Sequence, residues 1–245
     1  MTAGQATGNS RTSVTDLAGR TFGALLFDMD GTILSSIKAA ERVWAVWAKR
    51  PGLVVASFLP TIHGVKTIET IRRLRLPGVD PAAEALAITQ AEIGDVEGIE
   101  QIAGAATFLG TLPKDRWAIV TSAPLALALR RIEAARLPVA EVLVTAEDVS
   151  RGKPAPDCFL LAADRLGQKP TDCLVFEDAL PGITAAEAAG AAVLVVTAAH
   201  AHRLETSHPT IENYEGLLSS AHQDGRLSVA AVRKPTMGTS TIRRP

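Results

Sequence analysis

Two aspartates separated by one residue, Asp28 and Asp30, follow a short apolar run at residues 23–27. Carboxylates this close resist ionising together, because their like charges repel unless a cation neutralises them. Magnesium prefers hard oxygen ligands of this kind and often shares them with the oxygens of a bound phosphate. The pair therefore predicts a metal site at which phosphoryl chemistry takes place.

The two aspartates can divide the work of phosphoryl transfer between them. Asp28 can attack phosphorus and form an aspartyl-phosphate, which replaces one difficult hydrolysis by two easier displacements. Asp30 can protonate the departing alkoxide and later take a proton from the attacking water, a role usually worth about 10²- to 10⁴-fold in rate. An Asp-x-Asp after a strand is also a common turn or helix cap, so this interpretation needs support from the rest of the chain.

Three later groups of polar residues follow apolar runs in the same way. They are Thr121 with Ser122 after residues 117–121, Lys153 in the loop after residues 141–145, and Glu177 with Asp178 after residues 173–176. Ligands of open parallel sheets collect at the carboxyl ends of the strands. We therefore expect these groups to meet the aspartate pair in one site.

Each expected neighbour has a chemical use there. Asp28 and Asp178 can give carboxylate oxygens to an octahedral Mg²⁺ ion, and Asp30 can add its backbone carbonyl. Glu177 is close enough in sequence to help directly or through water.

The remaining groups suit a phosphate. Thr121, Ser122 and the amide of Ala123, at the start of a predicted helix, can donate hydrogen bonds to phosphoryl oxygens, and Lys153 adds a positive charge. Taken singly, such residues are usually solvated loop residues or helix starts. Their appearance in this order after successive strands is what favours a shared site.

Strand and helix patterns alternate in the second half of the chain. Strands are expected at residues 117–121, 141–145, 173–176 and 192–196, and helices at 125–136, 156–166 and 181–189. This alternation requires parallel pairing with right-handed crossovers. The expected fold class is α/β, a parallel sheet with helices on both faces and residues 23–27 at its centre.

The pattern between residues 35 and 109 is helical instead. Helices are expected at residues 37–49, 65–74, 82–93 and 98–109, with no convincing strand between them. The predicted organisation is a flexible leader at 1–19, a core at 20–34 and 110–222, an all-helical cap at 35–109, and a loosely ordered basic tail at 223–245.

Composition limits the partners. With 245 residues, 47% of them apolar, the chain can bury a large core, and a net charge of −1 offers no field for nucleic acid. Cys158 and Cys173 form neither a metal motif nor a disulfide framework. No apolar run approaches a membrane span, and the N-terminus lacks a secretory signal. We expect a cytoplasmic protein whose partner is a small phosphorylated metabolite, with a monomer favoured over a homodimer.

Four segments together resemble the signatures of the haloacid dehalogenase-like superfamily. They are residues 27–32 (Phe-Asp-Met-Asp-Gly-Thr), 120–122 (Val-Thr-Ser), 152–157 (Gly-Lys-Pro-Ala-Pro-Asp), and 176–178 (Phe-Glu-Asp) followed by Pro181-Gly182. The resemblance runs from about residue 22 to residue 215. It implies a Rossmann-like core, dependence on Mg²⁺, and a helical cap inserted between the first two signatures.

Within the superfamily the chain is similar to sugar and polyol phosphatases, such as those for glycerol 3-phosphate and 2-deoxyglucose 6-phosphate. Residues 62–64, 117–122 and 145–149 carry this likeness. Two departures stand out. Ser35 replaces an aspartate that many relatives carry, and Ala123 replaces a common glycine although its amide is retained.

The cap is expected to set specificity, because its closure brings recognition groups to the leaving group and excludes water. The candidates are His63, Lys66, Glu41 and Trp47. A purely structural role remains open for these residues. A histidine can cap a helix, a lysine can lie on a solvated helix face, and a tryptophan usually packs within a helical core.

Three other functions stay open. A phosphonoacetaldehyde hydrolase would need a Schiff-base lysine in the cap, for which Lys66 is the candidate. A phosphomutase of the β-phosphoglucomutase type would share every core residue. A metabolite-binding protein without catalysis is the third, although such a protein has no need for a nucleophile at Asp28.

Overall fold

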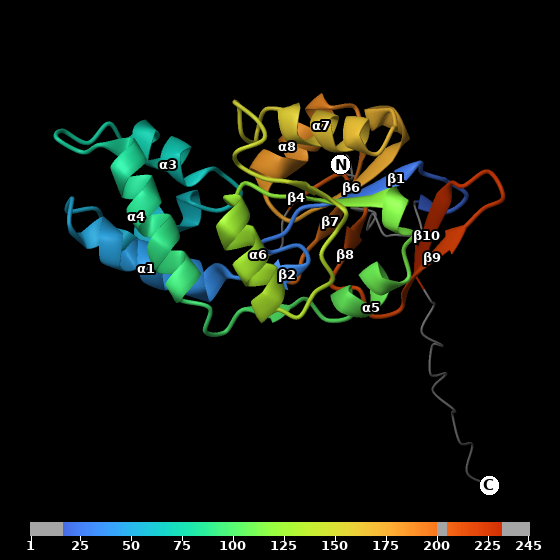
Figure 1. Cartoon of the computed structure of the whole chain (residues 1–245), viewed down its shortest axis with the longest axis horizontal. Coiled ribbons are helices and arrows are strands. Elements are labelled where there is room, and N and C mark those ends of the chain that lie inside the picture. The colour runs from blue at the N-terminus through green and yellow to red at the C-terminus, as the bar shows by residue number, and fades with distance from the viewer. Residues whose placement is uncertain (1–16, 200–204, 232–245) are drawn as a thin grey trace, which may run out of the picture.

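The computed structural model describes residues 17–199 and 205–231 (Figure 1). Most of the predicted leader at 1–19, and residues 232–245 of the predicted tail, lie outside these ranges.

The described residues form a core, an insert and two short strand pairs. The core strands are β1 (Ala24–Phe27), β4 (Trp117–Val120), β5 (Val142–Val144), β6 (Cys173–Glu177), β7 (Ala192–Val196) and β8 (Thr210–Ile211). The core helices are α5 (Ala105–Gly110), α6 (Leu125–Ala134), α7 (Asp157–Arg165) and α8 (Leu180–Ala188). The insert helices are α1 (Ile37–Lys49), α2 (Val55–Phe58), α3 (Thr67–Leu74) and α4 (Pro81–Gly94). The strand pairs are β2 (Leu34–Ser35) with β3 (Glu100–Gln101), and β9 (Leu217–Ala221) with β10 (Leu227–Ala231).

The core sheet confirms the predicted α/β fold class. Its six strands run in the order β5-β4-β1-β6-β7-β8, and each adjacent pair is parallel. β1 lies between β4 and β6, with Leu25 opposite both Trp117 and Leu174. The strand that leads into the aspartate pair is therefore held from both sides.

Side chains of β1 alternate between two hydrophobic clusters. Ala24 and Leu26 join the cluster that contains residues of α7 and α8. Leu25 and Phe27 join the larger cluster, which contains residues of α5 and α6. Phe27 stacks on Phe176 of β6, with ring centroids 4.4 Å apart. Helices thus cover both faces, and β1 is completely buried.

The insert has a cluster of its own. Trp44 and Trp47 of α1 pack edge to face, with ring centroids 5.5 Å apart, and both lie against Phe58. Ile71 of α3 and Ile88 of α4 complete this core. In Figure 1 the insert lies beside the sheet, with α6 between α4 and the core strands.

The helix expected at residues 98–109 is wrong in its first half. Residues 100–101 form β3, which pairs antiparallel with β2. Gly104 has a φ of 79°, a left-handed conformation that interrupts a helix, and α5 starts only after it. Phe108 and Leu109 of α5 pack in the larger core cluster. We therefore propose that the insert ends near residue 101 rather than at 109.

Packed structure also extends into both predicted terminal segments. Leu17 is buried in the larger cluster, so order begins before the expected Arg20. The prediction of a loosely ordered tail from residue 223 is wrong for β10. Leu227 exchanges two backbone hydrogen bonds with Phe22, each 2.7 Å long, and its side chain is 1% exposed.

Within the described ranges, no helix combines the length and the apolar character that crossing a membrane requires.

Substituting Leu227 by alanine tests whether β10 belongs to the core. We expect Leu227→Ala to lower the free energy of unfolding by about 2 to 5 kcal/mol, because it opens a cavity beneath the hairpin. Leu218→Ala is the matched control, since Leu218 lies on β9 but is 56% exposed, and it should cost less than about 0.5 kcal/mol. Urea unfolding measures both values. Equal, small losses would show that β10 contributes nothing.

Candidate active site

The predicted polar groups meet at the carboxyl ends of the core strands. Asp28 directly follows β1, Thr121 follows β4, and Glu177 ends β6 with Asp178 next to it. The structure brings one carboxylate oxygen each from Asp28, Glu177 and Asp178 within 4.8 Å of one another. All three side chains are buried.

Lys153 ties this cluster together from the loop between β5 and α7. Its Nζ donates hydrogen bonds to Oδ1 of Asp28 at 2.5 Å, to Oε1 of Glu177 at 2.8 Å and to the Val120 carbonyl at 3.3 Å. The lysine is 1% exposed. Burial lowers the pKa of Lys153, but Asp28 and Glu177 more than offset that effect, so its pKa is raised and the ammonium is retained.

Glu177 is fixed by α8 as well as by Lys153. Its Oε2 accepts hydrogen bonds from the backbone amides of Asp178 and Ala179, each 2.7 Å long, just before that helix. Gly182 makes this close approach possible, because a Cβ there would lie 1.5 Å from Oε1 of Glu177. The strand end and the helix start therefore hold the carboxylate in one position.

Gly31 allows a similar close approach of the backbone to Asp178. It has a φ of 89°, which favours glycine, and a Cβ at this position would lie 2.0 Å from Oδ2 of Asp178. The Thr32 hydroxyl donates to the other oxygen of Asp178 at 3.4 Å. The chain after β1 can thus pass directly over the end of β6.

Negative charge exceeds positive charge in this cluster. Among the described residues the cluster holds three carboxylates, and the ammonium of Lys153 pairs with two of them, Asp28 and Glu177. Burial raises the pKa of Asp28 to about 7, opposed by Lys153 and assisted by Glu177. Burial, then Glu177 and Asp28, also raise the pKa of Asp178 well above its usual range. An all-oxygen donor set with surplus negative charge fits a hard divalent cation such as Mg²⁺.

Asp30 turns away from this cluster toward α6 and the insert. Its Oδ1 accepts hydrogen bonds from the Ser36 hydroxyl and from Nη1 of Arg131, the latter at 2.9 Å. Nη2 of Arg131 donates to Oε1 of Glu92 on α4 at 3.1 Å. The two aspartates of the opening motif therefore lie in different surroundings.

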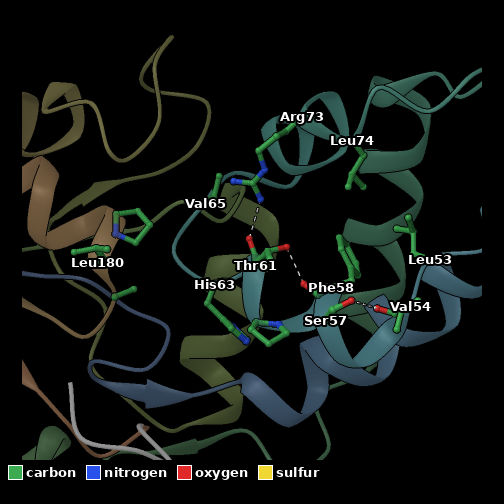
Figure 2. A pocket seen from close by; sticks show the side chains of 13 residues that line it. Leu53, Val54, Ser57, Phe58, Thr61, His63, Val65, Arg73, Leu74 and Leu180 are labelled. Atoms are coloured by element: carbon green, nitrogen blue, oxygen red, sulfur yellow. Dashed lines mark hydrogen bonds between the residues drawn. The ribbon is translucent and has the colours of Figure 1, made fainter. Parts of the chain in front are cut away.

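A cavity of about 70 Å³ lies between the two aspartates and the insert. Core residues that line it include Asp28, Asp30, Thr121, Ser122, Ala123, Leu127 and Arg131, and insert residues include Ala40, Trp44, Ile62, His63, Gly64, Val65, Thr67 and Glu92. A larger cavity of about 580 Å³ opens between the insert and the start of α8 (Figure 2). His63 and Val65 line both cavities, so the two spaces share one wall.

Comparison with known proteins agrees with this geometry. The family model described as "haloacid dehalogenase-like hydrolase" matches residues 22–190. The chain belongs to the haloacid dehalogenase-like hydrolases. The resemblance drawn from the four sequence segments is therefore confirmed.

Two related proteins and one solved structure show what this haloacid dehalogenase-like hydrolase is similar to. Hexitol phosphatase A of Escherichia coli (strain K12) is 44% identical over 177 residues, 71% of this chain and 82% of that protein. The 2-deoxyglucose-6-phosphate phosphatase 1 of Saccharomyces cerevisiae is 31% identical over 196 residues, 71% of this chain and 80% of that protein. A crystal structure of a hydrolase from Pseudomonas syringae aligns with a TM-score of 0.65 and 28% identity, covering 74% of this chain and 87% of that one.

The groups expected to bind phosphate have protein partners in this structure of the hydrolase. Oγ of Ser122 donates to the Gly64 carbonyl of the insert at 3.1 Å. The amide of Ala123 donates to Oγ1 of Thr121 at 3.0 Å. Phosphate binding by these groups stays a prediction, and it requires them to exchange these partners.

The insert residues expected to set specificity fall into two groups. His63 lines the cavity, and its Nε2 lies 3.6 Å from Oε1 of Glu41. Lys66 instead donates to the carbonyls of Ala146 and Val149 at 2.8 and 2.6 Å, which binds the insert to a core loop. Trp47 packs inside the insert and donates to Oε2 of Glu84 at 2.8 Å. None of Glu41, Lys66 and Trp47 is among the described residues that line either cavity, so the structure does not support their predicted substrate contacts.

Arg131 and Glu92 were missed by the sequence interpretation. Arg131 lies on the buried face of α6 with Leu127, Ala128 and Ile132. Glu92 lies on the buried face of α4 with Ile88 and Thr89. A charged residue that recurs on the apolar face of a helix predicts a buried ion pair, because such a side chain needs a buried partner.

The charge surplus predicts how metal-free hydrolase responds to pH. The pKa of Asp28 is about 7 in the folded protein against an ordinary 3.8, so between these values only the folded state holds the proton. Stability without metal should then fall as pH rises through this window, and Mg²⁺ should restore it most where the carboxylates are ionised.

Thermal unfolding at about pH 5.5 and about pH 7.5, with and without MgCl₂, measures this effect. We expect a larger Mg²⁺-induced rise in Tm at the higher pH, and we expect Asp178→Asn to reduce it. Asp115→Asn is the control, since the Asp115 side chain is 73% exposed and pairs with Arg116. A larger Mg²⁺-induced rise in Tm at the lower pH would contradict the assignment of the carboxylate cluster as the Mg²⁺ site.

Proposed function

We propose that this chain is a Mg²⁺-dependent phosphatase that hydrolyses a small sugar or polyol phosphate monoester through an aspartyl-phosphate on Asp28. The observation that carries the proposal is the buried cluster in which Lys153 bridges Asp28 and Glu177 beside Asp178. The family is one of hydrolases, and the related hexitol and 2-deoxyglucose-6-phosphate phosphatases support the substrate class.

Asp28 is the nucleophile in this mechanism. Its carboxylate lies at the end of β1, held by Lys153, and attacks phosphorus while the bond to the ester oxygen breaks. Asp28, Asp178 and the Asp30 carbonyl would hold Mg²⁺, with Glu177 assisting, and the ion would neutralise charge on the phosphoryl oxygens. Lys153 offsets part of the same charge and keeps Asp28 oriented.

Asp30 moves the protons. Its carboxylic acid protonates the departing ester oxygen, and the resulting carboxylate then takes a proton from the water that attacks the aspartyl-phosphate. Ser122 and the Ala123 amide, at the start of α6, bind the phosphoryl oxygens after leaving their present partners. The insert covers the site and limits the access of other water.

The leaving-group side of the cavity suits a small hydroxylated group. Polar groups from the insert line it at His63 and Thr67, whereas Trp44 and Ile62 supply apolar surface. A volume of about 70 Å³ leaves little room for a bulky ester in this arrangement. Polar contacts in a narrow space favour a sugar or polyol, since a hydroxyl can bond to each polar group.

Two alternatives to a phosphate-ester phosphatase can be weighed against the site. A phosphonoacetaldehyde hydrolase needs a free cap lysine, but Nζ of Lys66 is held by two core carbonyls. A phosphomutase would share the core residues, so it is separated from a phosphatase by its products alone. A cytoplasmic location and a monomeric state stay predictions.

Phosphate release from a panel of sugar and polyol phosphates tests the proposal. We expect turnover that requires Mg²⁺ and that falls by about 10³-fold or more in Asp28→Asn, because the amide is a poor nucleophile. Asp115→Asn, at an exposed aspartate, should retain activity. If no ester is hydrolysed, or if Asp28→Asn is as active as the parent, the proposed nucleophile is wrong.

Phosphorus NMR with β-glucose 1-phosphate separates a phosphatase from a mutase. A phosphatase gives inorganic phosphate, because water is the final acceptor of the phosphoryl group. Accumulation of glucose 6-phosphate in its place would overturn the choice of hydrolysis.

A further inference from the structure

A buried arginine joins the proton-transfer aspartate to the insert. Arg131 of α6 is 6% exposed, and its two terminal nitrogens reach two different carboxylates, Asp30 at 2.9 Å and Glu92 at 3.1 Å. Glu92 comes from α4 of the insert and is 4% exposed. The three side chains therefore form a continuous ionic chain across the boundary between insert and core.

Packing alone does not account for this arginine. Its neighbours on the buried face of α6 are Leu127, Ala128 and Ile132, and an apolar residue would fit among them without desolvating a charge. Nε of Arg131 is buried without a hydrogen-bond partner among the described residues. The side chain thus leaves one donor unused while both terminal nitrogens contact acids.

The contact fixes which oxygen of Asp30 is available for proton transfer. Ser36 and Arg131 both donate to Oδ1. Among the residues that the structure describes, Oδ2 has no hydrogen-bonded protein partner. The carboxyl plane is therefore set by two donors on one oxygen, and the other oxygen remains free to exchange a proton with an ester oxygen or a water.

We propose that Arg131 is a positioning residue for Asp30 and that Glu92 holds Arg131 in place from the insert. The proposal rests on the proposed function, in which Asp30 protonates the leaving oxygen. The proton passes from the Asp30 carboxyl to the ester oxygen as the phosphorus–oxygen bond breaks. Arg131 takes no part in this exchange, and its effect is to orient the carboxyl group that does.

Glu92 provides a second acidic partner for the guanidinium of Arg131. An isolated arginine beside Asp30 would place an uncompensated positive charge next to a group that must carry a proton. Glu92 pairs with the other terminal nitrogen and fixes the guanidinium plane, because each terminal nitrogen has its own acceptor. The acid is thus positioned by residues from both parts of the chain.

Dependence on the leaving group tests this role separately from folding. An alkoxide leaving group needs the proton from Asp30, whereas p-nitrophenolate leaves without it. The value of kcat/KM covers the steps up to departure of the leaving group, so it is measured for p-nitrophenyl phosphate and for the polyol phosphate that the parent hydrolyses best. We expect Arg131→Met to lower it about 10- to 100-fold for the polyol ester and less than about 3-fold for the aryl ester.

Arg130→Met is the matched control, since the side chain of the neighbouring Arg130 is 41% exposed and pairs with Glu133 one turn away. It should change neither value. Glu92→Gln, which keeps the shape of the side chain, should show the selective loss in weaker form and serves also if Arg131→Met fails to fold. Arg131→Met with Glu92→Gln should lose no more than Arg131→Met alone, because the two residues act as a unit.

Asp30→Asn separates failure of this inference from failure of the proposed function. If Asp30→Asn itself shows no selectivity for the alkyl ester, the assignment of Asp30 as the acid is wrong. If Asp30→Asn is selective while the Arg131 and Glu92 variants lose both activities equally, or neither, the positioning role is overturned.

Discussion

Excess negative charge in a buried site is the constraint on which the rest of the structure depends. Lys153 pairs with Asp28 and Glu177, Asp178 lies beside them, and burial raises the pKa of Asp28 and of Asp178. Repulsion of this size persists in a folded protein only if the backbone holds the groups together. A parallel sheet does so, because β1 and β6 are paired along their length and end at the same edge.

The same constraint explains the glycines and the division of labour between the two aspartates. Gly31 and Gly182 stand where any Cβ would collide with Asp178 or Glu177, so the backbone can pass close to both acids. Asp28 faces the charged cluster and the ammonium of Lys153. Asp30, two residues later, faces Arg131 and Ser36. A nucleophile and a proton carrier need different surroundings, and Asp28 and Asp30 have them although they are only two residues apart.

The core of the site could be predicted from sequence because its residues directly follow apolar strands, and parallel strands bring such positions together. The same reasoning could not place side chains that reach across the insert. Trp47 lies on α1 and Lys66 immediately precedes α3, and only packing decides that Trp47 bonds to Glu84 and Lys66 to a core loop. Arg131 and Glu92 were overlooked because charged residues were assumed to be solvated. Leu227 was assigned to a loose tail because the segment from residue 223 is basic and low in aromatic residues, although Leu227 and Val229 alternate as the buried positions of β10.

The stereochemical course at phosphorus tests the central claim, that Asp28 forms an aspartyl-phosphate, most directly. Hydrolysis of a substrate whose phosphoryl oxygens are isotopically labelled to make phosphorus chiral reports how many displacements occur. Two successive in-line displacements, first by Asp28 and then by water, predict overall retention of configuration. Inversion would mean that water attacks the substrate directly, and it would contradict the account.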